Sequence, residues 1–304
     1  MPELVVPTAA DAGRIAAVIN ERSLALGGET EESAAGVARW FAMPSLDPEA
    51  DMRLAVTAAG GVEGYVDVAG PEDGTPTAWI DLRVLPGSVE ALGLLFVWAQ
   101  ERAAERVGPG GKLQIFADER DGALRDRLDE AGYVVVRSSY GMERALDDDL
   151  ERPAWPAGIV ARPFDERDAE AVHVANDEAF EDHWGYTPSS FEGWRAFNLG
   201  PAADTSLWRV AWDGSEIAGV CINDPRRGED DTVGWVAVLA VRRPWRRRGL
   251  GEALLRESFL AFAERGKRAA GLGVDAENTT GAVSLYERVG MHVVRRSDTW
   301  ERLA

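Results

Sequence analysis

Residues 238–251 have the sequence VLAVRRPWRRRGLG, in which an apolar segment leads into a basic loop that contains two glycines. From Thr232 to Val241 most residues are β-branched or apolar, which predicts a buried strand. Pro244 ends the hydrogen-bond ladder of this strand because proline has no N–H to donate. Beyond the loop, apolar side chains recur at helical spacing, at Leu255, Phe259 and Phe262. The stretch therefore predicts a strand, a tight loop and a helix in succession.

Three features of this loop favour an anionic ligand. Gly249 and Gly251 have no Cβ, so a ligand can approach the backbone closely. The first N–H groups of the following helix have no partner within the helix, and the helix dipole favours negative charge there. The arginines at 246–248 add positive charge. We interpret the loop as a phosphate cradle; the alternative is a glycine-rich turn beside a solvated basic run.

The order of strand, Arg-x-x-Gly-x-Gly and helix resembles the coenzyme A pyrophosphate loop of the GNAT superfamily of N-acetyltransferases. The resemblance implies an α/β fold with a mixed, largely antiparallel sheet flanked by helices, and acetyl-CoA as co-substrate. It also implies that the strand separates from its neighbour before the loop, so that its backbone bonds the pantetheine arm. The cofactor-binding residues implied in this way are Leu239, Ala240, Val241, Arg246, Arg247, Arg248, Gly249, Leu250, Gly251 and Glu252.

A second match to the same superfamily lies downstream. A strand ending near Asp275 precedes a helix that Asn278 or Thr279 is expected to cap. In the GNAT resemblance an Asn contacts the coenzyme and a Tyr eight residues later lies near the thioester sulfur, which is the spacing of Asn278 and Tyr286. A phenol with a pKa of about 10 can protonate a thiolate whose conjugate acid has a pKa of about 8.5. We therefore predict a catalytic role for Tyr286; the alternative is simple packing on its helix face.

The acceptor side is expected in the acidic and aromatic segment 176–194. Such a lining attracts an ammonium group and stacks on a ring. Glu178 is the predicted catalytic base, although which acidic residue or histidine takes the proton stays open. The predicted substrate contacts are Asp182, His183, Trp184 and Trp235. The alternative is a capped surface helix followed by a turn that buries Trp184 and Tyr186.

The chain contains an internal repeat. Three pairs of matching positions share one offset of 158, namely Pro86 with Pro244, Gly132 with Gly290, and Glu143 with Glu301. This predicts two tandem GNAT-like domains at 1–147 and 159–304, joined by a charged, proline-containing linker at 148–158.

In the same register the first copy lacks the cradle. Its residues opposite Arg246, Gly249, Arg248, Asn278 and Tyr286 are Ser88, Ala91, Glu90, Arg120 and Leu128. Glu90 would repel a diphosphate at the position where Arg248 would attract it. We expect one coenzyme site, in the C-terminal domain, beside a degenerate N-terminal domain.

Composition excludes several classes of partner. The formal net charge of −19 in 304 residues repels nucleic acid and anionic membranes and attracts amine-bearing molecules. Cys221 is the only cysteine, and the start of the chain has no secretory leader, so a cytoplasmic location is expected. We also expect a monomer or a homodimer. The histidines at 173, 183 and 292 have no metal-ligand spacing, so no metal is expected.

These observations predict an acetyl-CoA-dependent N-acetyltransferase that acts on the primary amine of a small molecule by direct attack in a ternary complex. The tandem layout with one degenerate copy resembles the mycothiol synthase family. That family has an acidic residue where Trp235 stands here, so mycothiol synthesis is kept as a specific alternative. A non-catalytic acyl-CoA-binding sensor is a further alternative with the same coenzyme site.

Overall fold

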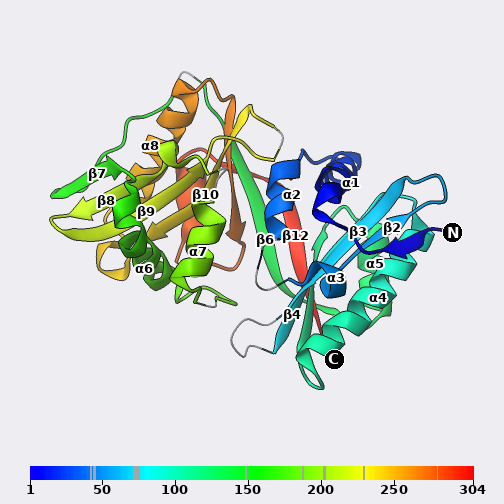
Figure 1. Ribbon diagram of the computed structural model, residues 1–304. Coiled ribbons are helices and arrows are strands. Elements are labelled where there is room, and N and C mark those ends of the chain that lie inside the picture. The colour runs from blue at the N-terminus through cyan, green and yellow to red at the C-terminus, as the bar shows by residue number, and fades with distance from the viewer. Residues whose placement is uncertain are drawn as a thin grey trace. The chain divides into compact units, whose positions relative to one another are not determined.

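The computed structural model describes residues 1–41, 43, 46–70, 76–147, 149–186, 188–200, 203–228, 230–278 and 280–304. The chain divides into two units, of which the first comprises Met1–Ser139 with Arg295–Ala304 and the second Tyr140–Val294 (Figure 1). Each unit combines helices with a largely antiparallel sheet, so the predicted mixed α/β class is confirmed. Residues 148 and 279, which the predicted linker and helix cap include, lie outside the described residues.

The first unit has the strand order β1-β2-β3-β4-β5-β12. Its pairs are antiparallel except for β4 with β5, which are parallel and connected through α4. Its strands are β1 (Glu3–Val5), β2 (Met52–Val56), β3 (Val62–Ala69), β4 (Thr77–Val84), β5 (Lys112–Asp118) and most of β12 (His292–Leu303). Its helices are α1 (Ala12–Ala25), α2 (Ala34–Trp40), α3 (Pro48–Asp51), α4 (Val89–Val107) and α5 (Gly122–Glu130).

The domain boundaries predicted from sequence assume two contiguous segments, and the units are not contiguous. The last strand of the chain, β12, pairs with β5 from Ser297↔Asp118 to Leu303↔Lys112, and so completes the sheet of the first unit. Its Trp300 lies in the core of that unit. The repeat therefore describes the sequence, whereas in the structure most of β12 belongs to the first unit and β6 is divided between the units at Ser139.

The second unit has the strand order β6-β11-β10-β9-β8-β7. Its strands are the second half of β6 (Val134–Ala145), β7 (Ile159–Pro163), β8 (Arg209–Asp213), β9 (Glu216–Asp224), β10 (Val233–Val241) and β11 (Ala269–Asp275). Its helices are α6 (Ala169–Phe180), α7 (Phe191–Asn198), α8 (Leu250–Glu264) and α9 (Ala282–Arg288). Short 3₁₀ turns lie at Glu166–Asp168, Thr205–Leu207 and Arg243–Trp245, and in the first unit at Ala9–Asp11.

Two layers of helices cover the sheet of the second unit (Figure 1). Side chains alternate along a strand, so Val220 and Ile222 of β9 pack with α6 and α7, whereas Cys221 between them packs with α8 and α9. The site described below lies where β10 passes between these two layers.

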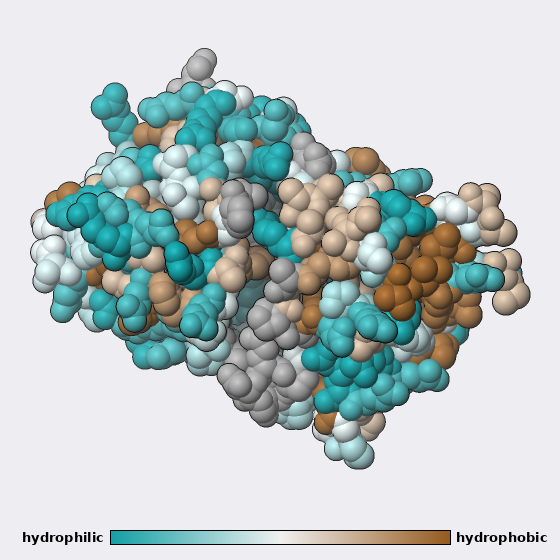
Figure 2. Space-filling view, viewed as in Figure 1, coloured by the Kyte–Doolittle hydropathy of each residue, from teal (hydrophilic) through white to brown (hydrophobic). Residues whose placement is uncertain are grey.

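The surface differs between the units in the view of Figure 2. Hydrophobic residues gather on the first unit near the N-terminal end of the chain, where exposed apolar side chains include Met1, Val5 and Val6. The visible surface of the second unit is mostly hydrophilic, in keeping with the negative net charge.

Candidate active site

Strand β10 separates from its parallel neighbour halfway along its length. The parallel register with β11 runs from Val233↔Ala269 to Val236↔Leu272. Beyond this point β10 continues to Val241 with β9 as its partner among the described strands, and a β-bulge at Ala237 marks the change. Among the described residues, one backbone edge of 237–241 therefore has no neighbouring strand and can bond an extended ligand.

The loop after β10 turns through two left-handed residues. Arg247 has φ 59° and Gly249 has φ 86°, and Gly249 is the N-cap of α8. Ala253 N donates to Gly249 O at 3.0 Å, which is the first bond of the helix, so the amides ahead of it point out of the helix end. A Cβ on Gly251 would lie 3.2 Å from Leu285 Cδ2 of α9, so little space remains there. The predicted succession of strand, tight loop and helix is confirmed.

The three loop arginines do not share one environment. Arg247 and Arg248 are exposed, and within the described part of the chain neither has an ion-pair or hydrogen-bond partner. The guanidinium of Arg246 is bonded internally. Its Nε donates to Val241 O at 3.0 Å, its Nη1 to Asp182 Oδ2 at 2.9 Å and its Nη2 to Ala179 O at 2.9 Å. Arg246 thus holds the loop in place, and Arg247 and Arg248 are available to an anion.

Two residues predicted on the acceptor side are engaged by arginines. Glu178 Oε2 accepts from Arg242 Nε at 2.7 Å. Asp182 Oδ1 accepts from Arg243 Nη2 at 2.6 Å, and the hydrogen bonds from Arg243 and Arg246 hold the pKa of Asp182 well below its usual range. With its pKa lowered in this way, Asp182 is a weak base. These contacts favour an anchoring role for both residues.

His183 has the environment of a neutral imidazole. It is half-buried, and its ring lies 4.3 Å from that of Phe180, measured between centroids. Burial and the charge of Arg246 lower the pKa of His183, while Asp275 and Asp182 act in the opposite direction. Its neighbour Trp184 is 41% exposed, which leaves the indole accessible to a ligand and differs from the alternative in which the turn buries it.

Tyr286 lies on α9 in the core of the second unit and is 7% exposed. Burial raises the pKa of Tyr286 well above its usual value, so the phenol keeps its proton at neutral pH. Burial also raises the pKa of the Cys221 thiol to about 12, and Cys221 Sγ lies 3.2 Å from Ser258 Oγ. The thiol is thus a buried core group.

Asn278 does not cap α9, so that prediction is wrong. The N-cap is Gly281 with φ 82°. Asn278 Oδ1 instead accepts from Thr280 N at 2.8 Å, which forms a turn before the helix begins at Ala282. The left-handed glycine is what ends this turn, and the sequence interpretation overlooked it.

Trp235 lies on β10 beside two residues that the sequence did not single out. The guanidinium of Arg227 lies 4.8 Å from the Trp235 ring centroid, and Arg227 Nη1 donates to Glu143 Oε1 at 2.7 Å. Gly271 on β11 accommodates the indole, because a Cβ there would lie 2.8 Å from the ring. In the sequence, Glu143 was noted only because it matches Glu301 in the repeat, and no motif surrounds Arg227. Only the sheet brings them to Trp235.

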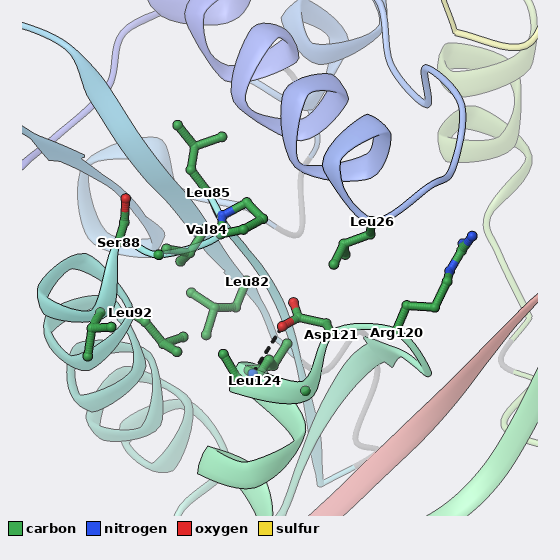
Figure 3. A pocket seen from close by; sticks show the side chains of 14 residues that line it. Leu26, Leu82, Val84, Leu85, Ser88, Leu92, Arg120, Asp121 and Leu124 are labelled. Atoms are coloured by element: carbon green, nitrogen blue, oxygen red, sulfur yellow. Dashed lines mark hydrogen bonds between the residues drawn. The ribbon is translucent and has the colours of Figure 1, made fainter.

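The corresponding part of the first unit is an apolar pocket of about 210 Å³ (Figure 3). It lies between the end of β4, the start of α4 and the start of α5. Its lining residues include Leu26, Leu82, Val84, Leu85, Ser88, Leu92, Arg120, Asp121 and Leu124. Arg120 is bonded to Asp118 and to Gly27 O, and Asp121 is bonded to Arg22 and to Leu124 N. The charges at this pocket are therefore neutralised internally.

Two kinds of feature are absent from the described residues. These residues contain no group of three or more His, Cys, Asp or Glu side chains placed to hold a metal ion. Within the same ranges, no helix has both the length and the apolar character needed to cross a membrane.

Comparison with known proteins agrees with this architecture. Residues 168–291 match the model of the acetyltransferase (GNAT) family. The chain is 30% identical to a mycothiol acetyltransferase of Geodermatophilus obscurus over 82% of its own length and 81% of the relative's. It is also 30% identical to that of Actinosynnema mirum, over 78% and 79%.

Solved structures give the same picture. A GCN5-related N-acetyltransferase from Sphaerobacter thermophilus is 32% identical with a TM-score of 0.78, over 99% of this chain and 95% of that one. A tandem GNAT protein from the clavulanic acid biosynthesis pathway shares the fold, with 20% identity, a TM-score of 0.71 and coverage of 100% and 98%. The chain belongs to the GCN5-related N-acetyltransferase family. It is an N-acetyltransferase with a tandem GNAT layout, and acetyltransferases of this family use acetyl-CoA.

Proposed function

We propose that the chain transfers the acetyl group of acetyl-CoA to the primary amine of a small molecule, in a ternary complex held by the second unit. The observation that carries this proposal is the open backbone edge of β10 from 237 to 241, which leads directly into the left-handed turn at Gly249 and the start of α8. An extended amide-bearing arm fits the open edge, and a diphosphate fits the helix end beside Arg247 and Arg248.

The second unit supplies side chains and backbone groups for each step of the acetyl transfer. The amine nitrogen attacks the thioester carbonyl carbon, and a free N–H on the edge of β10 polarises that carbonyl. When the carbon–sulfur bond breaks, its electron pair goes to the departing sulfur, and the protonated Tyr286 hydroxyl donates a hydrogen bond to this thiolate. We assign His183 as the base that takes the amine proton, in place of Glu178, because burial and Arg246 keep its imidazole neutral.

The relatives support one particular acceptor as a second candidate. They are named mycothiol acetyltransferases and cover about four fifths of the chain. Against that acceptor stands Trp235, with Arg227 across its ring, at the position where the sequence resemblance implies an acidic residue. We therefore propose a small primary amine in general and keep the acceptor of mycothiol acetyltransferases as the specific alternative.

Release of free thiol from acetyl-CoA, measured across a panel of amines with mass spectrometry of the products, tests this proposal. Tyr286→Phe is expected to lower kcat by about 100-fold, the order typical of a lost hydrogen-bond donor to a developing negative charge, and to leave the Kd of acetyl-CoA unchanged. Absence of turnover on every amine, with acetyl-CoA still bound, would favour an acyl-CoA-binding sensor.

A further inference from the structure

Three carboxylates at the end of α6 meet three arginines of the coenzyme loop. Glu178 pairs with Arg242 at 2.7 Å, Glu181 with Arg243 at 3.1 Å, and Asp182 with both Arg243 at 2.6 Å and Arg246 at 2.9 Å. We call this set the arginine–carboxylate cluster. Its acidic members belong to the segment that carries His183 and Trp184, and its basic members belong to the loop that begins the phosphate cradle.

The placement of these acids is unfavourable for the helix alone. A helix C-terminus is the negative end of the dipole, so acidic side chains there destabilise the helix. Here α6 ends at Phe180, and Glu178, Glu181 and Asp182 all lie in or just after its last turn. The arginines compensate for this placement. Arg246 also donates directly to Ala179 O, one of the carbonyls that the helix end leaves without an intrahelical partner.

The cluster connects backbone as well as side chains. Arg242 Nη1 donates to Ile217 O on β9 at 2.8 Å, and Arg246 Nε donates to Val241 O at the end of β10 at 3.0 Å. Through these bonds the end of α6 is attached to β9 and to the end of β10, the strand that leads into the coenzyme loop. Asp182 is the central member, because it binds two of the three arginines.

We propose that Asp182 is a positioning residue, which uses Arg243 and Arg246 to hold segment 181–186 against the coenzyme loop and so sets the acceptor-side groups at a fixed distance from the thioester. This proposal rests on the proposed function. It assigns Asp182 a role different from a direct contact with the amine, and the two roles predict opposite results for the arginine partner.

The decisive comparison is between Asp182→Asn and Arg243→Gln. If Asp182 positions the segment, both substitutions break the Asp182–Arg243 contact, so each raises the KM of the amine by about three- to tenfold. Because this contact is shared, the effect of the double variant is smaller than the product of the two single effects. If Asp182 binds the amine itself, Arg243→Gln frees its carboxylate and lowers the amine KM or leaves it unchanged. That second result would overturn the proposal.

Asp182→Glu and a matched control separate positioning from loss of fold. The conservative variant keeps the charge and is expected to recover part of the lost affinity for the amine. Glu166→Gln removes another exposed ion pair of the same unit, Glu166 with Arg195 at 3.1 Å, and is expected to leave both KM values unchanged. Equal effects of Glu166→Gln and Asp182→Asn would contradict a specific role.

Hydrogen exchange tests the proposal without any turnover. Glu181 N donates to Asp177 O and His183 N to Phe180 O, so these amides report on the order of the segment. Asp182→Asn is expected to accelerate their exchange, and Glu166→Gln is not. Unchanged exchange would reject the positioning role even for an active enzyme, and faster exchange with no amine acetylated would reject only the proposed function.

Discussion

A pair of carboxylates in the first unit shows how a single residue can make stability depend on pH. Asp67 on β3 lies directly opposite Asp81 on β4, and Tyr65 OH donates to Asp67 Oδ2 at 2.7 Å. Burial and the neighbouring charge of Asp81 raise the pKa of Asp67 to about 8. Asp67 therefore carries a proton at neutral pH in the folded protein, whereas in the unfolded chain it loses that proton at a pKa of about 3.9.

Asp67→Asn tests this buried proton. Between pH 4 and pH 8 the folded state binds one more proton than the unfolded state, so this site makes stability fall as pH rises, by at most about 1.4 kcal/mol per pH unit. The amide has no proton to lose, so the variant is expected to lose less stability between pH 5 and pH 8. Unfolding midpoints at three pH values measure it, with the exposed Asp126→Asn as the control. Parallel pH profiles for wild type and Asp67→Asn would contradict the account.

At the scale of an element, the start of α8 depends on a left-handed glycine. Gly249 has φ 86°, and a Cβ built there meets no atom within 4 Å. An alanine would therefore encounter backbone strain, on the order of 1 to 3 kcal/mol, but no clash within the protein. The open space in front of it is the space that the proposed diphosphate occupies.

Gly249→Ala is accordingly expected to weaken acetyl-CoA binding at least tenfold, because the new methyl group stands between the ligand and the amides. Gly266 lies just beyond the other end of α8 with φ 73° and equally open surroundings, so Gly266→Ala is the matched control for strain. Calorimetric titration measures the two Kd values, and unfolding curves compare the stabilities. Equal Kd values in the two variants would remove Gly249 from the coenzyme site.

The elements of the site were predictable where local chemistry decides them. Pro244, the two glycines and the apolar spacing after Gly251 all act within a few residues, and the strand, loop and helix lie where they predict. The partners of the acidic segment were not predictable, because Glu178 and Arg242 are 64 positions apart and meet only through packing of α6 on the sheet. For the same reason, the sequence could not predict that Glu143 lies near Trp235.

At the scale of the molecule, the sequence repeat predicted two similar halves but not which segments of the chain belong to each compact unit. A repeat of 158 residues suggests a cut in the charged segment near 148–158, because such segments are typical linkers. The pairing of Ser297 with Asp118 and the burial of Trp300 instead assign the end of the chain to the first unit. Strand pairing between distant segments leaves no local pattern, so only the structure reveals it.

The two units also differ in what they offer a coenzyme. The first unit has Glu90 at the position of Arg248, and its pocket is lined mainly by apolar residues, with the charges of Arg120 and Asp121 paired internally. We propose that the cradle of the second unit is the one that binds acetyl-CoA. Both the stoichiometry of binding and its response to a charge reversal follow from this assignment.

Calorimetric titration of the full chain with acetyl-CoA tests this claim most directly, with wild type and Arg248→Glu compared, since that substitution reproduces the charge of the first unit. We expect wild type to bind one equivalent per chain and Arg248→Glu to lose that binding. Two equivalents in wild type, or one equivalent that survives Arg248→Glu, would contradict it.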